Sequence, residues 1–326
     1  MRTLGGRYEL VQRIGIGGMS EVWRGHDQVL DRPVAVKIMA PAVEGTLGSV
    51  SGVELIQTEA RSAARLAHPN VANVHDFGTA TAPDRDVPYI VMELVEGQTL
   101  GDHLAAGPID WRIGVRICAE VAAALAAAHA EHVVHRDIKP ANIMLTPSGA
   151  KVLDFGIAAA AGSPDPDPDG PVMGTPAYVA PERFDGLPAT PATDMFALGV
   201  LLYHCLAGRL PWQAATHTEL VEAQQHGEPD PLPHIEGLAP EVVDMCSRCL
   251  HHDPLERPTA LVAALLLAET VDARVYVPLM DVEAITPRAT ISPWTQRAAE
   301  APTSVAMPSA TANDHPTDRV GRHRAG

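Results

Sequence analysis

The segment HRDIKPAN at residues 135–142, followed twelve residues later by DFG at 154–156, constrains this 326-residue chain more than any other feature. The carboxylate of Asp137 can accept or orient a hydroxyl proton, and the ammonium of Lys139 can neutralise charge on a migrating phosphoryl group. The side chains of Asn142 and Asp154 offer the hard oxygen ligands that magnesium prefers. This order of groups predicts transfer of a phosphoryl group from a nucleotide to a hydroxyl.

Both segments are complete, and they resemble the H-R-D-x-x-x-x-N and D-F-G motifs of the protein kinase family. The resemblance implies that Asp137 is the catalytic base and that Lys139 assists it. It also implies that Asn142 and Asp154 bind Mg²⁺, with Mn²⁺ as an alternative ion. Lysine at position 139 is typical of serine/threonine kinases, because tyrosine kinases carry a different sequence there.

Residues 8–14 read as a strand that enters the glycine-rich turn GIGGMSEV at 15–22. Glycines let backbone N–H groups approach phosphates closely, so the turn is a candidate cover for a nucleotide. Ser20 takes the place of the third glycine in the G-x-G-x-x-G pattern of the family. A plain hairpin stays open as an alternative. A dinucleotide-binding turn would need a helix next, whereas residues 21–25 read as strand and turn.

Residues 32–38 alternate like a strand and place Lys37 on its inner face. A lone strand lysine is usually a solvated edge residue, but the resemblance to the V-A-x-K segment of kinases implies that Lys37 grips the α and β phosphates. Glu59 shares one helical face with the apolar residues Leu55, Ala63 and Leu66. Because a carboxylate among apolar residues is costly without a cation, we predict a Lys37–Glu59 ion pair. Glu54 is the competing partner and fits the family pattern less well.

The buried-type strand at 89–94 resembles the hinge region of kinases, which implies a hinge at 93–97. Met92 is then the gatekeeper, and backbone groups of Glu93 and Val95 should meet the adenine edge. An adenine slot also needs apolar walls. The full set expected to bind ATP is Ile14, Gly15, Gly17, Gly18, Val22, Ala35, Lys37, Met92, Glu93, Val95 and Met144.

An Ala-rich helix is predicted over 110–130, with a core face of Ile113, Ile117, Val121, Leu125 and Ala128. The segment GTPAYVAPE at 174–182 resembles the peptide-binding floor of serine/threonine kinases. In this family Thr175 would hydrogen-bond to Asp137, and Glu182 would pair with a buried arginine, here Arg257. Asp194 should accept backbone hydrogen bonds from the catalytic loop.

The resemblance covers roughly residues 8–268 and is closest to the bacterial eukaryotic-like (Hanks-type) serine/threonine kinases. It implies an α+β, two-lobed fold with a small antiparallel sheet and one helix, then a larger helical lobe. The expected kinase domain spans 8–269, with an N-lobe at 8–94 and a C-lobe at 98–269. Residues 270–326 form an Ala/Thr/Pro-rich tail that we expect to be largely disordered.

Composition is compatible with this interpretation. The net charge of −16 argues against nonspecific binding to nucleic acid or to anionic membranes. The apolar stretches at 121–128 and 260–268 are shorter than the ~20 residues of a membrane span, and residues 1–6 lack the apolar core of a signal peptide. We therefore expect a cytoplasmic protein. The C-x-x-C at 246–249 is read as helix packing rather than as a metal site.

The activation segment departs from that of similar kinases, since residues 157–173 contain no threonine. Arg136 is of the type that receives an activating phosphate in this family. One hypothesis is that the aspartates supply fixed negative charge near Arg136 and reduce the need for phosphorylation. A solvated loop that touches nothing is the alternative. The residues concerned are Ser163, Asp165, Asp167 and Asp169.

Similar kinases often continue into a membrane span, whereas this chain stops after its tail, which favours a form without a span. The tail threonines could be autophosphorylated and recruit phosphothreonine-binding partners, or the tail could stay unmodified. They are Thr286, Thr290, Thr295, Thr303, Thr311 and Thr317. Pairing of small lobes into a homodimer is a further expectation from the resemblance.

The sequence thus predicts a serine/threonine protein kinase that transfers the γ-phosphoryl group of Mg-ATP to protein hydroxyls and phosphorylates itself. The main alternative is a pseudokinase, a nucleotide-binding scaffold that acts by interaction. The presence of Lys37, Asp137, Asn142 and Asp154 counts against it. A small-molecule phosphotransferase on the same fold is a third reading, and the floor at 175–182 counts against that one.

Overall fold

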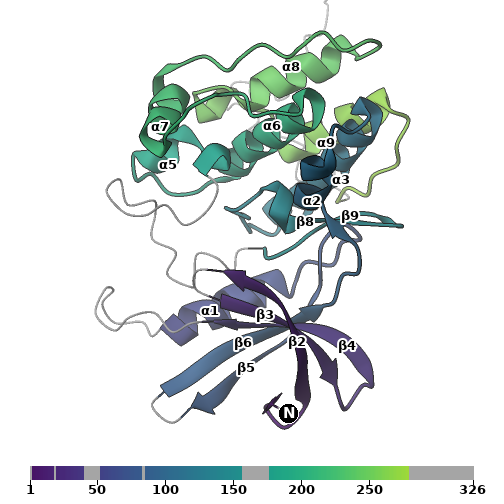
Figure 1. Cartoon of the computed structure of the whole chain (residues 1–326), viewed down its shortest axis with the longest axis vertical. Coiled ribbons are helices and arrows are strands. Elements are labelled where there is room, and N and C mark those ends of the chain that lie inside the picture. The colour runs from purple at the N-terminus through teal and green to yellow at the C-terminus, as the bar shows by residue number, and fades with distance from the viewer. Residues whose placement is uncertain (1, 18–19, 40–51, 83–84, 156–175, 279–326) are drawn as a thin grey trace, which may run out of the picture. The chain divides into compact units, whose positions relative to one another are not determined.

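The structure, a computed structural model, shows an antiparallel sheet with one helix, followed by a mainly helical part (Figure 1). These two parts are the predicted N-lobe and C-lobe. The described residues are 2–17, 20–39, 52–82, 85–155 and 176–278. The predictions for Gly18, for Thr175, for the activation segment from 156 and for the tail from 279 lie outside the described residues.

The N-lobe sheet has six antiparallel strands in the order β1-β2-β3-β4-β6-β5. Helix α1 (Gly52–Ala63) follows β4 in the chain and packs against β5 and β6. The strands are β1 Arg2–Leu4, β2 Tyr8–Gly17, β3 Ser20–Asp27, β4 Arg32–Met39, β5 Val74–Ala82 and β6 Arg85–Glu93.

Strand β4 is buried on both faces of the sheet. Its successive side chains point to opposite sides, and each side has its own apolar cluster. Ala35 and Met39 join Ile56 and Ala60 of α1 in one apolar cluster. Val34, Val36 and Ile38 join a second cluster on the other face, with Leu10, Tyr89 and Val91 among its members. Lys37 shares the α1 side of the sheet with Ala35, since the two are separated by one residue. This alternation aims the lysine at the face where α1 lies.

Strand β1 precedes the predicted start of the kinase domain. It pairs with the start of β2, and Leu4 is buried in the second apolar cluster. Gly5 and Gly6 form the connecting turn at φ 55° and 64°, which residues with a Cβ adopt at a cost. A Cβ on Gly5 would also lie 2.4 Å from the hydroxyl of Tyr89. The hairpin therefore depends on glycine for both its conformation and its close packing.

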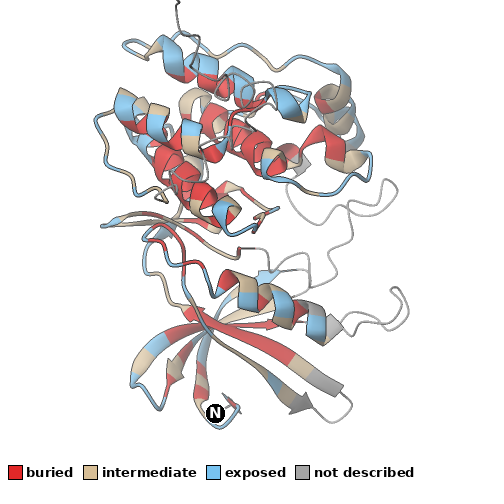
Figure 2. Cartoon of the chain, turned by 180° about the vertical axis from the view of Figure 1, so that it is seen from behind, coloured by how far each residue is buried: buried red, intermediate tan, exposed pale blue. Residues whose placement is uncertain are grey.

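The C-lobe is built around α3 and α6, which are mostly buried in Figure 2, and α9 packs along α3. Its helices are α2 Leu100–Ala106, α3 Trp111–Ala130, α5 Pro181–Phe184, α6 Pro191–Ala207, α7 His217–His226, α8 Pro240–Cys249 and α9 Ala260–Thr270. The 3-10 helices in the part of the chain that the structure describes are η1 Pro140–Asn142, η2 Pro176–Tyr178 and η3 Pro254–Glu256. Several helices begin at a side-chain cap, such as Asp110, which accepts from the N–H of Arg112.

Helix α3 confirms the helix predicted after Asp110, with one correction to its core face. Ile117, Val121, Leu125 and Ala128 are buried, but Ile113 is 54% exposed because it lies in the first turn of the helix. Among the described helices, α3 alone has the length and apolar composition of a membrane span. However, 72% of that stretch is buried inside the protein, as expected of a core helix.

A second, three-stranded sheet joins the lobes, formed by β7 Gln98–Thr99, β8 Ile143–Thr146 and β9 Gly149–Val152. The loop after α1 is bonded to it through Asn70, whose Nδ2 lies 2.7 Å from the carbonyl oxygen of Ala150. The carbonyl of Asn70 in turn accepts from the N–H of Val152 at 2.8 Å. These bonds hold the end of α1 beside the strands that carry the catalytic segments.

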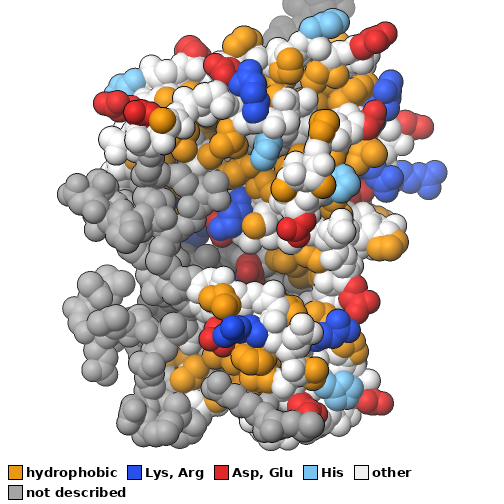
Figure 3. Space-filling view, viewed as in Figure 1, with side chains coloured by type: hydrophobic (Ala, Val, Ile, Leu, Met, Phe, Trp, Pro, Cys, Tyr) orange, Lys and Arg blue, Asp and Glu red, His pale blue; other side chains and the backbone are white. Residues whose placement is uncertain are grey.

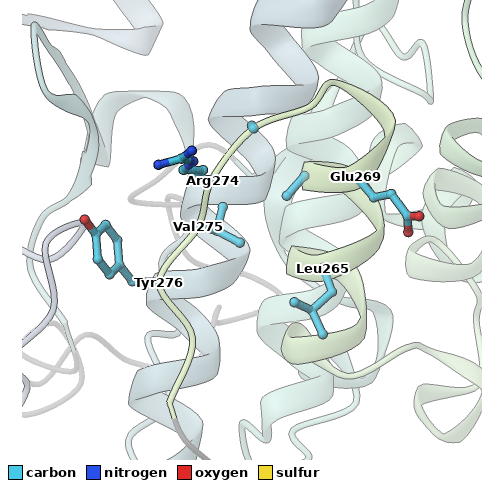
Figure 4. A pocket seen from close by; sticks show the side chains of 7 residues that line it. Leu265, Glu269, Arg274, Val275 and Tyr276 are labelled. Atoms are coloured by element: carbon cyan, nitrogen blue, oxygen red, sulfur yellow. The ribbon is translucent and has the colours of Figure 1, made fainter.

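Residues 271–278, beyond α9 and past the predicted domain end, are packed on the C-lobe. Residues 271–278 alternate between partly buried and exposed positions, and Val275 and Val277 pack on the C-lobe core. Nε2 of His68 lies 2.9 Å from the carbonyl oxygen of Tyr276. An open hollow of about 590 Å³ lies between this segment and α9, with Leu265 and Arg274 among its lining residues (Figure 4). The segment therefore ties the end of the C-lobe to the loop after α1.

Cys246 and Cys249 are buried on α8, and Gly199 of α6 packs against Cys249. Burial raises the pKa of the Cys249 thiol to about 12 and that of Cys246 well above its usual value. Both are therefore protonated at neutral pH and act as small apolar packing residues.

On the face shown in Figure 3, acidic and basic side chains are interspersed over both lobes.

Candidate active site

The catalytic segment folds into a compact polar cluster around Asp137. Nζ of Lys139 lies 2.7 Å from Oδ2 of Asp137, and Nδ2 of Asn142 lies 2.9 Å from the same oxygen. Nδ2 of Asn142 also donates to the carbonyl of Asp137 at 2.8 Å. One carboxylate oxygen is thus held by two donors, which fixes the orientation of the other. The structure thus brings Lys139 and Asn142, both predicted from the sequence, into direct contact with the carboxylate of Asp137.

Asp194 of α6 binds the start of the catalytic segment through backbone hydrogen bonds. Its two carboxylate oxygens accept from the N–H groups of His135 and Arg136, each at 2.8 Å, as predicted. Nε2 of His129 donates to the same carboxylate at 2.8 Å. Arg136 has a φ of 72°, an unfavourable conformation for a residue with a side chain. The bonds to Asp194 offset that strain.

His135 links the catalytic segment to the residues before Phe155. Its Nε2 lies 2.8 Å from the carbonyl oxygen of Leu153, and its Nδ1 lies 3.2 Å from the N–H of Asp137. A carbonyl only accepts and a backbone N–H only donates, so the ring is neutral with its proton on Nε2. The ring also meets Phe155 edge-on, with centroids 4.6 Å apart. One imidazole therefore orients both motifs.

Asp154 and Lys37 meet between the two lobes. Nζ of Lys37 lies 2.9 Å from Oδ2 of Asp154, and the lysine side chain is only 8% exposed. Asp154 has a φ of 60°. The N–H of Leu153 donates to the carbonyl of Asn142 at 2.9 Å, which holds Asp154 beside the catalytic segment. The lysine of β4 is thus bound to the motif that follows β9.

The predicted Lys37–Glu59 ion pair is replaced by two other pairs. Oε1 of Glu59 lies 3.2 Å from NH1 of Arg136, while Lys37 is bound to Asp154. Glu59 was correctly expected to face a cation from the inner side of α1. The positive φ of Arg136 turns its side chain toward α1, so the arginine rather than the lysine neutralises Glu59 here. Glu54, the alternative partner, is exposed.

The expected adenine wall is assembled by sheet register. Gly15 lies opposite Val22, and Val22 opposite Lys37. Ala35 lies opposite Met92, and both are buried. Directly opposed residues of antiparallel strands share one face. The glycine turn, the lysine and the gatekeeper position therefore lie along a single face of the sheet.

Other members of the predicted ATP set lie nearby along the chain but are more open. Ile14 is 50% exposed, and Val95 and Met144 are partly buried. The N–H of Glu93 donates to the carbonyl of Asn73 at 2.8 Å, so the carbonyl of Glu93 is the backbone group predicted to meet an adenine edge. The side chain of Glu93 pairs with Lys151 at 2.8 Å, which ties the hinge to β9.

The predicted Glu182–Arg257 pair is present and buried. NH1 and NH2 of Arg257 donate to the two carboxylate oxygens of Glu182 at 2.7 and 2.9 Å. The guanidinium is fully buried, and it also donates to the carbonyls of Ala192, His251 and His252. This pair anchors the segment after η2 to the far end of the C-lobe.

The family model described as the protein kinase domain matches residues 8–267 of this chain. The chain belongs to the protein kinase family.

Similar proteins include three bacterial kinases. The serine/threonine-protein kinase PknA of Mycobacterium tuberculosis is 38% identical over 258 residues, which are 78% of this chain and 59% of PknA. PrkC of Bacillus subtilis is 38% identical over 65% of this chain and 32% of its own length. PknB of Mycolicibacterium smegmatis is 39% identical over 71% of this chain and 37% of its own length. The chain therefore spans about a third to three fifths of these relatives.

The donor set of this kinase fits a magnesium-bound nucleotide. Nδ2 of Asn142 donates to the carbonyl and to the carboxylate of Asp137, so Oδ1 is the atom of this amide that would bind the ion. Asp154 contributes a carboxylate from the adjoining segment. Mg²⁺ usually takes one or two protein oxygens and completes its shell with phosphate and water. Among the described residues no cluster of three or more His, Cys, Asp or Glu side chains could hold a metal ion by itself.

Sequence reasoning missed several residues that position the kinase motifs. His129 bonds to Asp194, and Asn70 bonds to β9. Burial and the charge of Arg136 both lower the pKa of the Arg183 guanidinium. Little in the sequence distinguished His129, since a histidine near the end of an apolar helix usually packs in the core. Only the three-dimensional contacts reveal these roles.

Proposed function

We propose that this chain is a serine/threonine protein kinase that transfers the γ-phosphoryl group of Mg-ATP to protein hydroxyls. One observation carries the proposal. Asp137, Lys139 and Asn142 form one hydrogen-bonded cluster beside the Lys37–Asp154 ion pair. These are the groups that hold a hydroxyl, a phosphoryl group and a nucleotide in the kinase mechanism. The activity of its relatives in the same family supports the proposal.

In the proposed reaction Asp137 receives the acceptor hydroxyl. Its Oδ2 is held by Lys139 and Asn142, so Oδ1 is the oxygen that accepts the hydroxyl proton. Lys139 lies beside the same carboxylate and neutralises charge on the migrating phosphoryl group. Because phosphoryl transfer asks little covalent work of the protein, positioning and charge neutralisation supply most of the effect.

The nucleotide is placed by groups of both lobes. Lys37 binds its α and β phosphates, the glycine turn from Gly15 covers them, and Ala35 and Met92 border the adenine. Asn142 and Asp154 would hold magnesium, which when bound neutralises phosphate charge. For Lys37 to reach phosphates, its present bond to Asp154 must be shared or exchanged. Glu59 is the residue proposed to take up Lys37 during that exchange.

The test is replacement of Asp137 by Asn in an assay with radiolabelled ATP and a histone preparation as acceptor. Loss of the base should lower turnover by about 10²–10⁴-fold, with the thermal transition unchanged. Asp244→Asn, at an exposed ion pair of α8, is the matched control. Phosphate incorporation that persists in Asp137→Asn would show that Asp137 is not the catalytic base. Nucleotide binding without any transfer by the native chain would favour the pseudokinase alternative, and transfer only to small molecules would favour the third reading.

Activation is proposed to involve Arg136, which is now paired with Glu59. Fixed charge from Asp165, Asp167 or Asp169 could bind Arg136 and release Glu59, and a solvated loop without contacts is the alternative. Phosphatase-treated native protein and Ser163→Ala separate the two. Retained activity in both supports fixed charge. A large loss in both contradicts it.

We further propose autophosphorylation of tail threonines, with a phosphothreonine-binding partner, and N-lobe homodimers. Mass spectrometry after incubation with ATP tests the first, because an unmodified tail would rule out docking through phosphate. Light scattering of the full chain tests the second. A cytoplasmic location stays a prediction.

A further inference from the structure

The short helix η2 (Pro176–Tyr178) contacts α6 and α7, and α7 lies beside α5 (Figure 1). Polar side chains of α6 and α7 bond to η2. The hydroxyl of Tyr178 lies 2.8 Å from Nδ1 of His204 on α6. Nε2 of Gln224 on α7 donates to the carbonyl of Ala177 at 2.9 Å. Two consecutive residues of the proposed peptide floor are therefore held by two different helices.

The Tyr178–His204 bond joins two neutral groups. Tyr178 is 8% exposed, and burial raises the pKa of its hydroxyl, which therefore keeps its proton. Burial also lowers the pKa of His204, so its imidazole is neutral at physiological pH. A neutral imidazole and a phenol hydroxyl can each donate or accept, so the two groups share one hydrogen bond in either imidazole tautomer. A side chain that can hydrogen-bond to the tyrosine hydroxyl is needed at this position to keep the bond.

Gln224 is the most buried polar residue of α7, at 2% exposed. Its Oε1 has no hydrogen-bond partner among the described residues, although an unpaired buried acceptor is costly. The reverse orientation of the amide would place an oxygen against the carbonyl of Ala177, so the bond to the floor dictates this one. The adjoining Gln225 donates to Asp185 at 3.1 Å, which holds the chain after α5 to the same helix.

Helix α6 also holds the catalytic segment. Asp194 accepts the N–H groups of His135 and Arg136, and His204 lies ten residues further along the same helix, about 15 Å away. Residues 193–203 of α6 are all buried, so it is part of the rigid core. One helix therefore sets the position of the residues beside Asp137 and of the floor on which an acceptor peptide would lie.

We propose that His204 and Gln224 are positioning residues for the protein substrate. Their hydrogen bonds to Tyr178 and Ala177, here called the clamp, fix the floor in the position from which an acceptor hydroxyl reaches Asp137. This inference rests on the proposed kinase function. The clamp acts on the acceptor and not on the nucleotide, because η2 belongs to the C-lobe floor while Lys37 and the glycine turn belong to the N-lobe sheet.

The first test separates the two substrates. Steady-state kinetics of the full chain with a histone preparation are measured for Tyr178→Phe, His204→Ala and Gln224→Met. Each change should raise KM for histone at least fivefold while KM for ATP stays within twofold. His226→Gln, an exposed histidine at the end of α7, is the control and should match the native chain.

The second test asks whether the hydrogen bond itself matters. His204→Gln offers an oxygen that can accept from Tyr178, so it should restore KM for histone to within twofold of the native value. The double variant Tyr178→Phe/His204→Ala should be no worse than either single variant, because both remove the same bond. Thermal transitions within a few degrees of the native chain show that the variants are folded.

The outcomes are distinguishable. If the native chain transfers no phosphate to histone or to itself, the kinase proposal fails and the clamp fails with it. If the native chain transfers phosphate and His204→Ala matches it, the clamp alone is wrong. Equal increases in KM for ATP and for histone, or a His204→Gln variant as impaired as His204→Ala, would mean that His204 only supports the fold and would also overturn the inference.

Discussion

Oε1 of Glu59 lies 3.2 Å from NH1 of Arg136, so the carboxylate of α1 is bound to the catalytic segment while Lys37 is bound to Asp154. In this arrangement Lys37 is engaged by Asp154, and a nucleotide held by Lys37 would share or replace that bond. We propose that Glu59 then leaves Arg136 for Lys37.

Replacing Glu59 by Gln should lower kcat/KM for ATP about 10–100-fold, since Lys37 would lose the carboxylate that holds it against the phosphates. Steady-state kinetics with varied ATP measure this. Glu54→Gln changes an exposed residue of the same helix and should stay within twofold of the native chain. A native-like Glu59→Gln would mean that Glu59 serves only to hold Arg136.

The buried pair of Glu182 and Arg257 should contribute strongly to stability. Glu182→Gln leaves a fully buried guanidinium without its counter-charge and should lower the free energy of unfolding by about 3–5 kcal/mol. Arg257→Lys should also be costly, because an ammonium cannot reproduce the two-pronged contact. Chemical denaturation is the measurement, with Asp244→Asn, at an exposed pair, expected to change stability by under ~1 kcal/mol. Similar small losses for Glu182→Gln and Asp244→Asn would refute this role.

The hinge should not tolerate a side chain at Gly97. A Cβ there would lie 2.1 Å from the carbonyl oxygen of Leu145 on β8, so the two segments would have to separate. We expect Gly97→Ala to lower the thermal transition by several degrees and to raise KM for ATP. Gly101→Ala is the matched control, because its Cβ would meet atoms only at 3.5 Å or more and alanine favours the helix. Equal thermal transitions for the two variants would contradict the prediction.

His68 should make stability depend on pH. Burial lowers its pKa, the bond to the Tyr276 carbonyl opposes that shift, and nearby Lys151 lowers the pKa further. Because the folded pKa lies below the unfolded value of about 6.5, the unfolded chain takes up the proton first. The contribution of His68 is thus complete above about pH 7 and declines as the pH falls through the unfolded pKa.

The measurement is the free energy of unfolding at pH 7.5 and 5.5. Nδ1 of His68 accepts from the N–H of Asn70, and protonation removes that acceptor. His68→Gln should therefore lose less stability than the native chain between the two values. The pKa values of His75 and His204 are also lowered by burial, so a smaller dependence should remain. Identical losses in the native chain and in His68→Gln would show that His68 is not the cause.

Much of the fold followed from patterns that local chemistry controls. Alternation in residues 32–38 and the helical repeat after Asp110 predicted β4 and α3, since period two and period 3.6 each suit one backbone conformation. The partners of Asp194 and Glu182 were predicted from the resemblance to the kinase family, and both are present. Strand β1 and the packed segment 271–278 were not predicted, since each is stabilised by contacts with residues remote in sequence.

By itself the sequence determined which groups are present: the base, the amide, the lysines and the carboxylates of a kinase site, in family order. Tertiary structure alone decided which cation each carboxylate holds. Glu59 could reach Lys37 or Arg136 by its place on α1, and the backbone turn at Arg136 and the proximity of Asp154 to Lys37 selected the arginine. An ion pair depends on distances of a few ångströms between segments far apart in the chain, and no local pattern encodes those distances.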